Sequence, residues 1–77
     1  MQLRIKYFGQ IAEVTQKEED TIEFQGASIS ELIEALYSKY SALKYENFQV
    51  AQNQELVSIE SKITGNEIAL LPPFAGG

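Results

Sequence analysis

The sequence predicts an α+β fold, a mixed five-stranded sheet with one main helix packed across it. Two observations predict this architecture. The first is the residue pattern, in which alternating polar and apolar residues mark short strands and an apolar stripe of helical period marks one helix. The second is the order of these elements, which is strands, helix, strands. A chain of 77 residues forms one domain with a thin core, which leaves little material to wall in a substrate pocket. We therefore expect a protein that is not catalytic alone.

The first part of the chain predicts a hairpin. Residues 2–8 alternate polar and apolar side chains, as a half-buried strand does, and residues 9–10 interrupt the pattern. Residues 22–24 predict a short second strand, joined to the first by a loop too long for a tight turn. The acidic run at residues 18–20 in that loop predicts a solvated turn.

An amphipathic helix is predicted over about residues 29–40. Ser28 and Glu31 have the spacing of a capping box, in which the serine hydroxyl accepts from the glutamate amide while the glutamate reaches back. Behind this box, apolar side chains recur with the period of one helix face. The stripe consists of Ile29, Leu32, Ile33, Leu36, Tyr37 and Tyr40.

Three more strands are predicted after an irregular stretch, over residues 48–52, 56–60 and 67–71, with turns at 53–54 and 64–66. A helix crossover leaves parallel strands, so the first and last strands can lie side by side at the sheet centre. That arrangement is the β-grasp, or ubiquitin-like, roll. The predicted inward side chains are Leu3, Ile5, Tyr7, Ile22, Phe24, Phe48, Val50, Val57, Ile59, Ile68 and Leu70.

The same alternation places three large apolar side chains, Phe8, Leu56 and Leu71, on the outer face of the sheet. If the first and last strands are parallel neighbours, Phe8 and Leu71 end at the same edge. A cluster of exposed apolar residues indicates a partner-docking surface. The alternative is that the strand ends curl and bury Phe8 under the loop that follows it.

Composition excludes several kinds of chemistry. The chain has no cysteine and no histidine, so it has no thiolate, disulfide or zinc–thiolate site and lacks the commonest metal ligand. We expect it to bind no metal or cofactor. A net charge of −5 without a Lys/Arg cluster argues against nucleic acid, and no stretch approaches the roughly 20 apolar residues of a membrane span. We expect a cytoplasmic protein.

The last six residues form the sharpest feature of the sequence. They divide the chain into a domain over residues 1–71 and an extended tail over residues 72–77, because two prolines stop a strand and favour a stiff departure from the sheet. Glycines without side chains can thread a narrow channel. The pattern predicts an arm that carries its terminal carboxylate into another protein's active site. The tail reads Pro72, Pro73, Phe74, Ala75, Gly76 and Gly77.

With these residues the sequence closely resembles the small, sulfur-carrier subunits of molybdopterin synthases. The likeness spans essentially the whole chain and is carried by residues 7–13, residues 50–57, Gly65 with residues 67–69, and above all residues 71–77. The Pro-Pro-x-x-Gly-Gly end is its most specific part. The segment 41–47 shows little likeness to the family.

The resemblance implies a cycle at Gly77. An E1-like adenylyltransferase uses ATP and magnesium to adenylate the carboxylate, and a sulfurtransferase or cysteine desulfurase system converts it to a thiocarboxylate. The tail then enters the large synthase subunit, where sulfur passes to cyclic pyranopterin monophosphate (precursor Z) to make molybdopterin. The resemblance also implies a heterotetramer of two small and two large subunits, with Phe8, Leu56 and Leu71 at the docking surface. Leu71 stands where the family often has an aromatic residue.

Three other functions fit the same features. The chain could carry sulfur for thiazole synthesis or for tRNA thiolation, with the same mechanism at Gly77 and a different recipient. It could be a ubiquitin-like modifier joined through Gly77 to lysines of other proteins. It could also be a plain interaction module whose Gly-Gly end has no chemical role. The Pro-Pro step before the tail favours the molybdopterin branch.

Overall fold

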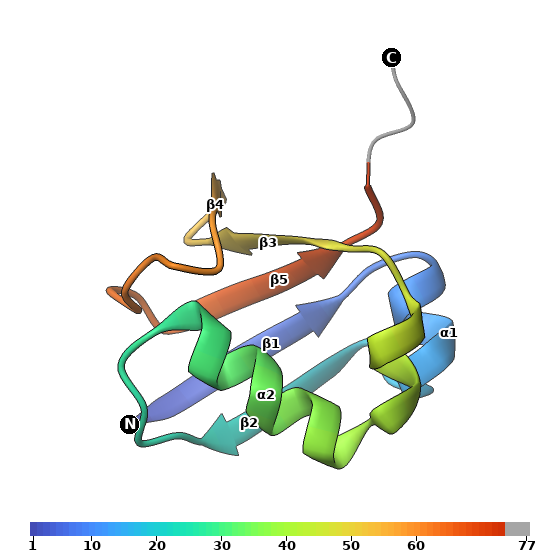
Figure 1. The fold of residues 1–77 in the computed structure, drawn as a ribbon, viewed down its shortest axis with the longest axis horizontal. Helices are drawn as coiled ribbons and strands as arrows, with labels where there is room; N and C mark the ends of the chain where they lie inside the picture. The colour runs from blue at the N-terminus through green and yellow to red at the C-terminus, as the bar shows by residue number, and fades with distance from the viewer. Residues whose placement is uncertain (74–77) are drawn as a thin grey trace.

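A computed structural model describes residues 1–73 of the chain. Five strands form one sheet in the order β2-β1-β5-β3-β4, and a single long helix crosses one of its faces (Figure 1). This confirms the predicted α+β architecture. The strands are β1 (Gln2–Tyr7), β2 (Glu19–Glu23), β3 (Gln49–Gln52), β4 (Glu55–Val57) and β5 (Glu67–Leu71). The helices are α1 (Gln10–Thr15), α2 (Ile29–Lys39) and the 3-10 helix η1 (Ser41–Tyr45).

The first and last strands lie together at the centre of the sheet. β1 and β5 are parallel, with Ile5 opposite Ile68 and Tyr7 opposite Leu70. β2 adds to the free edge of β1, and β3 to the free edge of β5, both antiparallel, while β4 pairs antiparallel with β3. This is the β-grasp order that the crossover argument predicted.

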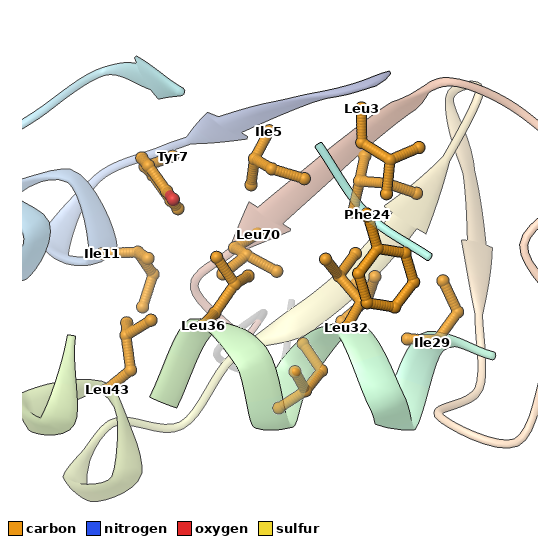
Figure 2. Close-up of a cluster of buried hydrophobic side chains, with 13 residues drawn as sticks. Leu3, Ile5, Tyr7, Ile11, Phe24, Ile29, Leu32, Leu36, Leu43 and Leu70 are labelled. Carbon is orange, nitrogen blue, oxygen red and sulfur yellow. The ribbon is translucent and has the colours of Figure 1, made fainter. Parts of the chain in front are cut away.

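The core lies between the sheet and α2. In Figure 2 the inward side chains of β1 point toward those that α2 directs at the sheet, and Ile11 of α1 faces Leu43 of η1 at one end. Burying these apolar side chains is the main driving force for folding. Those that are almost fully buried are Leu3, Ile5, Ile11, Ile29, Leu32, Leu36, Leu43, Ile68 and Leu70.

The start of α2 has the predicted capping box. The amide of Glu31 donates to the Ser28 hydroxyl at 3.3 Å, and the Glu31 carboxylate accepts from the amide of Ser28 at 3.1 Å. These two bonds satisfy donors that have no partner inside the helix. The Glu31 carboxylate also accepts from the amide of Ala27 at 3.0 Å. This bond, with help from the Ser28 hydroxyl and amide, holds the pKa of Glu31 below its ordinary value.

Two short helices were not predicted from the sequence. α1 follows β1 and buries Ile11 and Thr15, which are four residues apart on one helix face. η1 fills the stretch that was predicted to be irregular, and it buries Leu43. Six and five residues give too few turns for a periodic pattern to stand out.

The prediction that the acidic run at residues 18–20 forms a solvated turn is wrong. β2 already begins at Glu19, and Asp20 is 7% exposed on the inward face. The register explains this burial, since Asp20 lies opposite Ile5 and alternates with the half-buried Ile22. A polar side chain on a core face is tolerated only where partners satisfy it.

Asp20 has four such partners. Its Oδ2 accepts from the hydroxyl groups of Tyr7 at 2.9 Å and Tyr40 at 2.6 Å. Its Oδ1 lies 3.1 Å from the ammonium group of Lys17 and 3.5 Å from that of Lys39. Burial alone would raise the pKa of Asp20, but the bonds from Tyr40, Tyr7 and Lys17 outweigh it and lower this pKa to about 2. Burial and the Asp20 charge raise the pKa of Tyr7.

Three side chains predicted to point inward lie outside the strands to which they were assigned, and one of them is exposed. β4 ends at Val57, and Ile59 lies in the following turn with 57% of its surface exposed, so its prediction as a core residue is wrong. Phe24 is buried as predicted, although it lies just beyond the end of β2. Phe48 packs against the core from just before β3.

Among the described residues, no helix is long and apolar enough to cross a membrane.

We expect Asp20→Asn to make folding less sensitive to acid. The folded pKa of about 2 lies below the ordinary 3.8, so Asp20 stabilises the fold above about pH 4, and this stabilisation is lost as the pH falls toward 2. The difference corresponds to about 2 kcal/mol. Urea unfolding at pH 7 should show the variant about 2 kcal/mol less stable, with the gap closing near pH 2.

Glu18→Gln, at an exposed position two residues before Asp20, is the matched control and should unfold like the parent chain at both pH values. A gap between Asp20→Asn and the parent chain that stays constant down to pH 2 would show that the carboxylate charge contributes nothing.

Candidate functional site

Small side chains form the middle of the outer sheet face. In the register, Ala51 of β3 lies opposite Ala69 of β5, which in turn lies opposite Lys6 of β1. Leu56 of β4 lies opposite Ala51 on the other side. Two methyl groups between larger neighbours leave a hollow in the surface. Ala51 is nevertheless only 6% exposed, because the side chains around it rise above it.

That hollow is a groove of about 370 Å³, lined by Lys6, Phe8, Ala51, Gln54, Leu56, Glu67, Ala69 and Leu71. The structure thus brings together all three predicted docking residues, Phe8, Leu56 and Leu71, although they come from three different segments. Phe8 is 44% and Leu56 58% exposed, while Leu71 is partly buried. The alternative in which Phe8 is buried under the following loop is wrong. We call this groove the outer groove.

The charges at the rim of the outer groove compensate one another. The ammonium group of Lys6 lies 3.6 Å from a carboxylate oxygen of Glu67. Both side chains are about one-third exposed, so the pair is held close to the apolar surface. A partner that covers the groove therefore meets a mainly apolar surface with a neutral ion pair beside it.

The chain leaves the sheet beside Gly9. The amide of Phe8 donates to the carbonyl of Leu70 at 3.1 Å, which continues the β1–β5 ladder to its end. Gly9 then turns with a φ of 55°, where a side chain is strained. A Cβ built on Gly9 would lie 2.8 Å from Cγ of Pro72, so the proline ring rests against the bare backbone of the glycine. Pro72 is partly buried there and Pro73 is exposed.

The predicted tail residues Phe74, Ala75, Gly76 and Gly77 lie outside the described residues. The prediction that Gly77 carries the chemistry therefore stays a prediction, as does the division at residue 71. What the structure does give is the base of the tail, with Leu71 in the outer groove and Pro72 seated at Gly9. Residues 1–73 contain no cluster of three or more His, Cys, Asp or Glu side chains that could hold a metal ion.

A tight hairpin holds Leu56 at the edge of the groove. Asn53 and Gln54 connect β3 to β4 with φ values of 49° and 71°, as a two-residue turn with left-handed backbone requires. The amide of Asn53 donates to the carbonyl of Glu67 at 3.0 Å. The buried Gln52 side chain accepts from the amide of Thr64 at 2.8 Å and so fixes the next loop.

The sequence did not single out the contact at Gly9 or the other residues of the groove, which are Lys6, Ala51, Gln54, Glu67 and Ala69. The two alanines share the alternation of Leu56 and Leu71, so a search for small residues between large outward ones would have found them. The contact of Gly9 with Pro72 leaves no signal in the sequence, because it depends on the register of β1 against β5.

Fold and site together define a β-grasp protein of the ubiquitin-like class, with an apolar sheet face next to the base of a C-terminal Gly-Gly tail. A family model described as the ThiS family matches residues 5–77. The chain belongs to this family. This match and the relatives described next confirm the resemblance to the sulfur-carrier subunits of molybdopterin synthases.

Individual relatives agree with this assignment. The chain is 32% identical, over an alignment 83 positions long, to a Chlamydomonas reinhardtii protein named molybdopterin synthase sulfur carrier subunit, and the match covers both chains completely. Among solved structures it is similar to SAMP1 from Haloferax volcanii, with 25% identity, complete coverage of both chains and a TM-score of 0.82. It is also similar to a chain in the complex of subunits 1 and 2 of molybdopterin-converting factor from Helicobacter pylori, with 25% identity, complete coverage of both chains and a TM-score of 0.69.

We expect Gly9→Ala and Pro72→Ala to be coupled. The new methyl group at residue 9 meets the Pro72 ring and also strains the positive φ, so Gly9→Ala alone should cost about 1–3 kcal/mol of unfolding free energy. Removing the ring relieves the collision but not the strain. The double variant should therefore be more stable than the sum of the single effects predicts, by at least about 0.5 kcal/mol. Additive losses in urea unfolding would mean that the ring does not rest on Gly9.

Proposed function

We propose that this protein is the sulfur-carrier subunit of a molybdopterin synthase. One observation carries the proposal, namely 32% identity over the whole of both chains to a protein named as such a carrier. Three features of the chain support it. These are membership of the ThiS family, the Gly-Gly end of the sequence, and an apolar groove at the base of the tail.

In this proposal the Gly77 carboxylate is the reactive group. An E1-like adenylyltransferase joins it to AMP from ATP with magnesium and releases pyrophosphate. The persulfide sulfur of a sulfurtransferase or cysteine desulfurase system attacks the adenylate and displaces AMP, and a thiol of that system then reduces the acyl disulfide to the thiocarboxylate. This sulfur then bonds to cyclic pyranopterin monophosphate (precursor Z), and water hydrolyses the resulting thioester and restores the carboxylate. The chain supplies the carboxylate and its delivery, and its partners supply the catalytic groups, so it is not an enzyme alone.

The large synthase subunit covers the outer groove in this proposal. The apolar floor of the outer groove and the neutral Lys6–Glu67 pair beside it suit a stable protein interface, because covering them leaves no unpaired charge buried. Leu71 lies in the groove and Pro72 directly follows it, so a partner seated there also meets the base of the tail. The Helicobacter pylori structure, a complex of subunits 1 and 2, supports such a pairing.

A second function is favoured by the likeness to SAMP1, a small archaeal modifier protein. In that case the same activated Gly77 forms an amide with a lysine of another protein. The chemistry of activation is shared, and the two functions differ in the nucleophile that takes the acyl group.

The mass of the untagged protein from its native cell distinguishes these functions. A mass increase equal to one oxygen replaced by sulfur, absent when Gly77 is deleted, is the expected result. A covalent adduct to another protein through Gly77 would establish the modifier. An unchanged mass after incubation with the activating enzyme, ATP and a sulfur donor would refute both.

Adding one alanine after Gly77 should abolish sulfur transfer, because the adenylated carbon then belongs to the wrong residue. The fold should not change, since the described core ends with β5. Molybdopterin formation with the purified large subunit and the thermal unfolding midpoint give the two readouts. Normal molybdopterin formation by the extended chain would contradict the role of Gly77.

Leu56→Asp should weaken binding to the large subunit at least about tenfold, because it places a charge in the apolar interface. Leu56 is already 58% exposed in the free chain, so the unfolding midpoint should hardly move. Tyr45→Asp is the matched control, because Tyr45 is 86% exposed and lies on η1, away from the outer groove. Equal binding by both variants in calorimetry would place the interface elsewhere.

A further inference from the structure

The molecule has a second groove, on the helix side of the sheet. It measures about 300 Å³ and is lined by Ser30, Ile33, Glu34, Tyr37, Glu46, Asn47, Phe48 and Ile59. α2 supplies one wall, and the segments just before β3 and just after β4 supply the other. α2 packs on the inner face of the sheet (Figure 1). This helix-side groove and the outer groove therefore lie on opposite sides of the sheet.

The apolar part of the helix-side groove is left uncovered by the fold. Ile59 is 57% exposed, although the strand pattern had predicted it to be buried, and Tyr37 and Phe48 are only partly buried beside it. Ile59 is nevertheless held in place. Its carbonyl accepts from the amide of Ser30 at 2.9 Å, and the carbonyl of Ser61 accepts from the amide of Ile29 at 2.9 Å. The turn is thus tied to the start of α2 and forms an ordered wall.

The charges of the helix-side groove are uncompensated, in contrast to those of the outer groove. Glu34 and Glu46 line it, and neither takes part in any ion pair among residues 1–73. Lys44, close by in sequence, is paired with neither of them. Two carboxylates beside exposed apolar surface complement a cation carried next to apolar side chains.

We propose that the helix-side groove binds a protein segment in which a lysine or arginine stands next to aliphatic residues. The aliphatic side chain covers Ile59 and Phe48, and the cation lies between Glu34 and Glu46. This proposal does not rest on the sulfur-carrier function. Because the two grooves lie on opposite faces, such a segment can bind while the outer groove is occupied.

Two synthetic peptides test the proposal, acetyl-Arg-Leu-Arg-Leu-amide and the acidic counterpart acetyl-Glu-Leu-Glu-Leu-amide, each titrated into the ¹⁵N-labelled full chain. We expect the basic peptide to shift the amide signals of Ile33, Phe48 and Ile59, and the acidic peptide to shift none of them. Glu34→Gln with Glu46→Gln should weaken the basic peptide about fivefold, as expected when two partly exposed charge pairs are lost. Higher salt should weaken it as well.

Matched variants separate specific binding from general attraction to an acidic protein. Ile59→Ala should weaken the basic peptide, whereas Leu56→Ala, an equally exposed aliphatic position in the outer groove, should not. Glu13→Gln removes an exposed charge on α1 and should also have no effect. The proposal is overturned if the shifted amide signals are spread over all acidic segments, or if the basic peptide shifts no amide signal. It is also overturned if Leu56→Ala weakens binding of the basic peptide more than Ile59→Ala does.

Discussion

The parallel pairing of β1 with β5 is the constraint on which the rest of the structure depends. It sets Ile5 beside Ile68 in the core, and it carries the ladder to the bond from Phe8 to Leu70. From that bond it follows that the residues after the two strands also meet, which is why Gly9 touches Pro72. Core, outer groove and base of the tail therefore share one register. A slip of one residue would turn every side chain of a strand to the other face.

The two grooves proposed as partner surfaces differ in their physical character. On the outer face, small alanines and a compensated ion pair form a surface on which binding is favoured mainly because apolar area is removed from water. On the helix side, unpaired carboxylates add a long-range attraction that salt weakens. One small domain with a single core can thus present two surfaces of different selectivity.

Much of the fold could be predicted because each long element has its own signal. The capping box at Ser28 and the alternation in β1 and β5 are local patterns, and the order of elements then leaves few topologies. The outward side chains of the outer groove followed from the same alternation. Asp20 was misjudged because its burial depends on two tyrosines distant in sequence. Ile59 was misjudged because β4 stops before it.

The central position of β5 has a consequence for how the chain is made. During synthesis from the N-terminus, β1, β2 and α2 emerge before β5, so one edge of β1 has no neighbour until the last strand arrives. An unpaired apolar strand is a template for aggregation, and charged side chains protect such strands. Arg4 and Lys6 stand on the outer face of β1, and in the finished fold they pair with Glu19 and Glu67. The same two cations can therefore disfavour aggregation of the nascent chain and later form ion pairs with the strands on either side of β1.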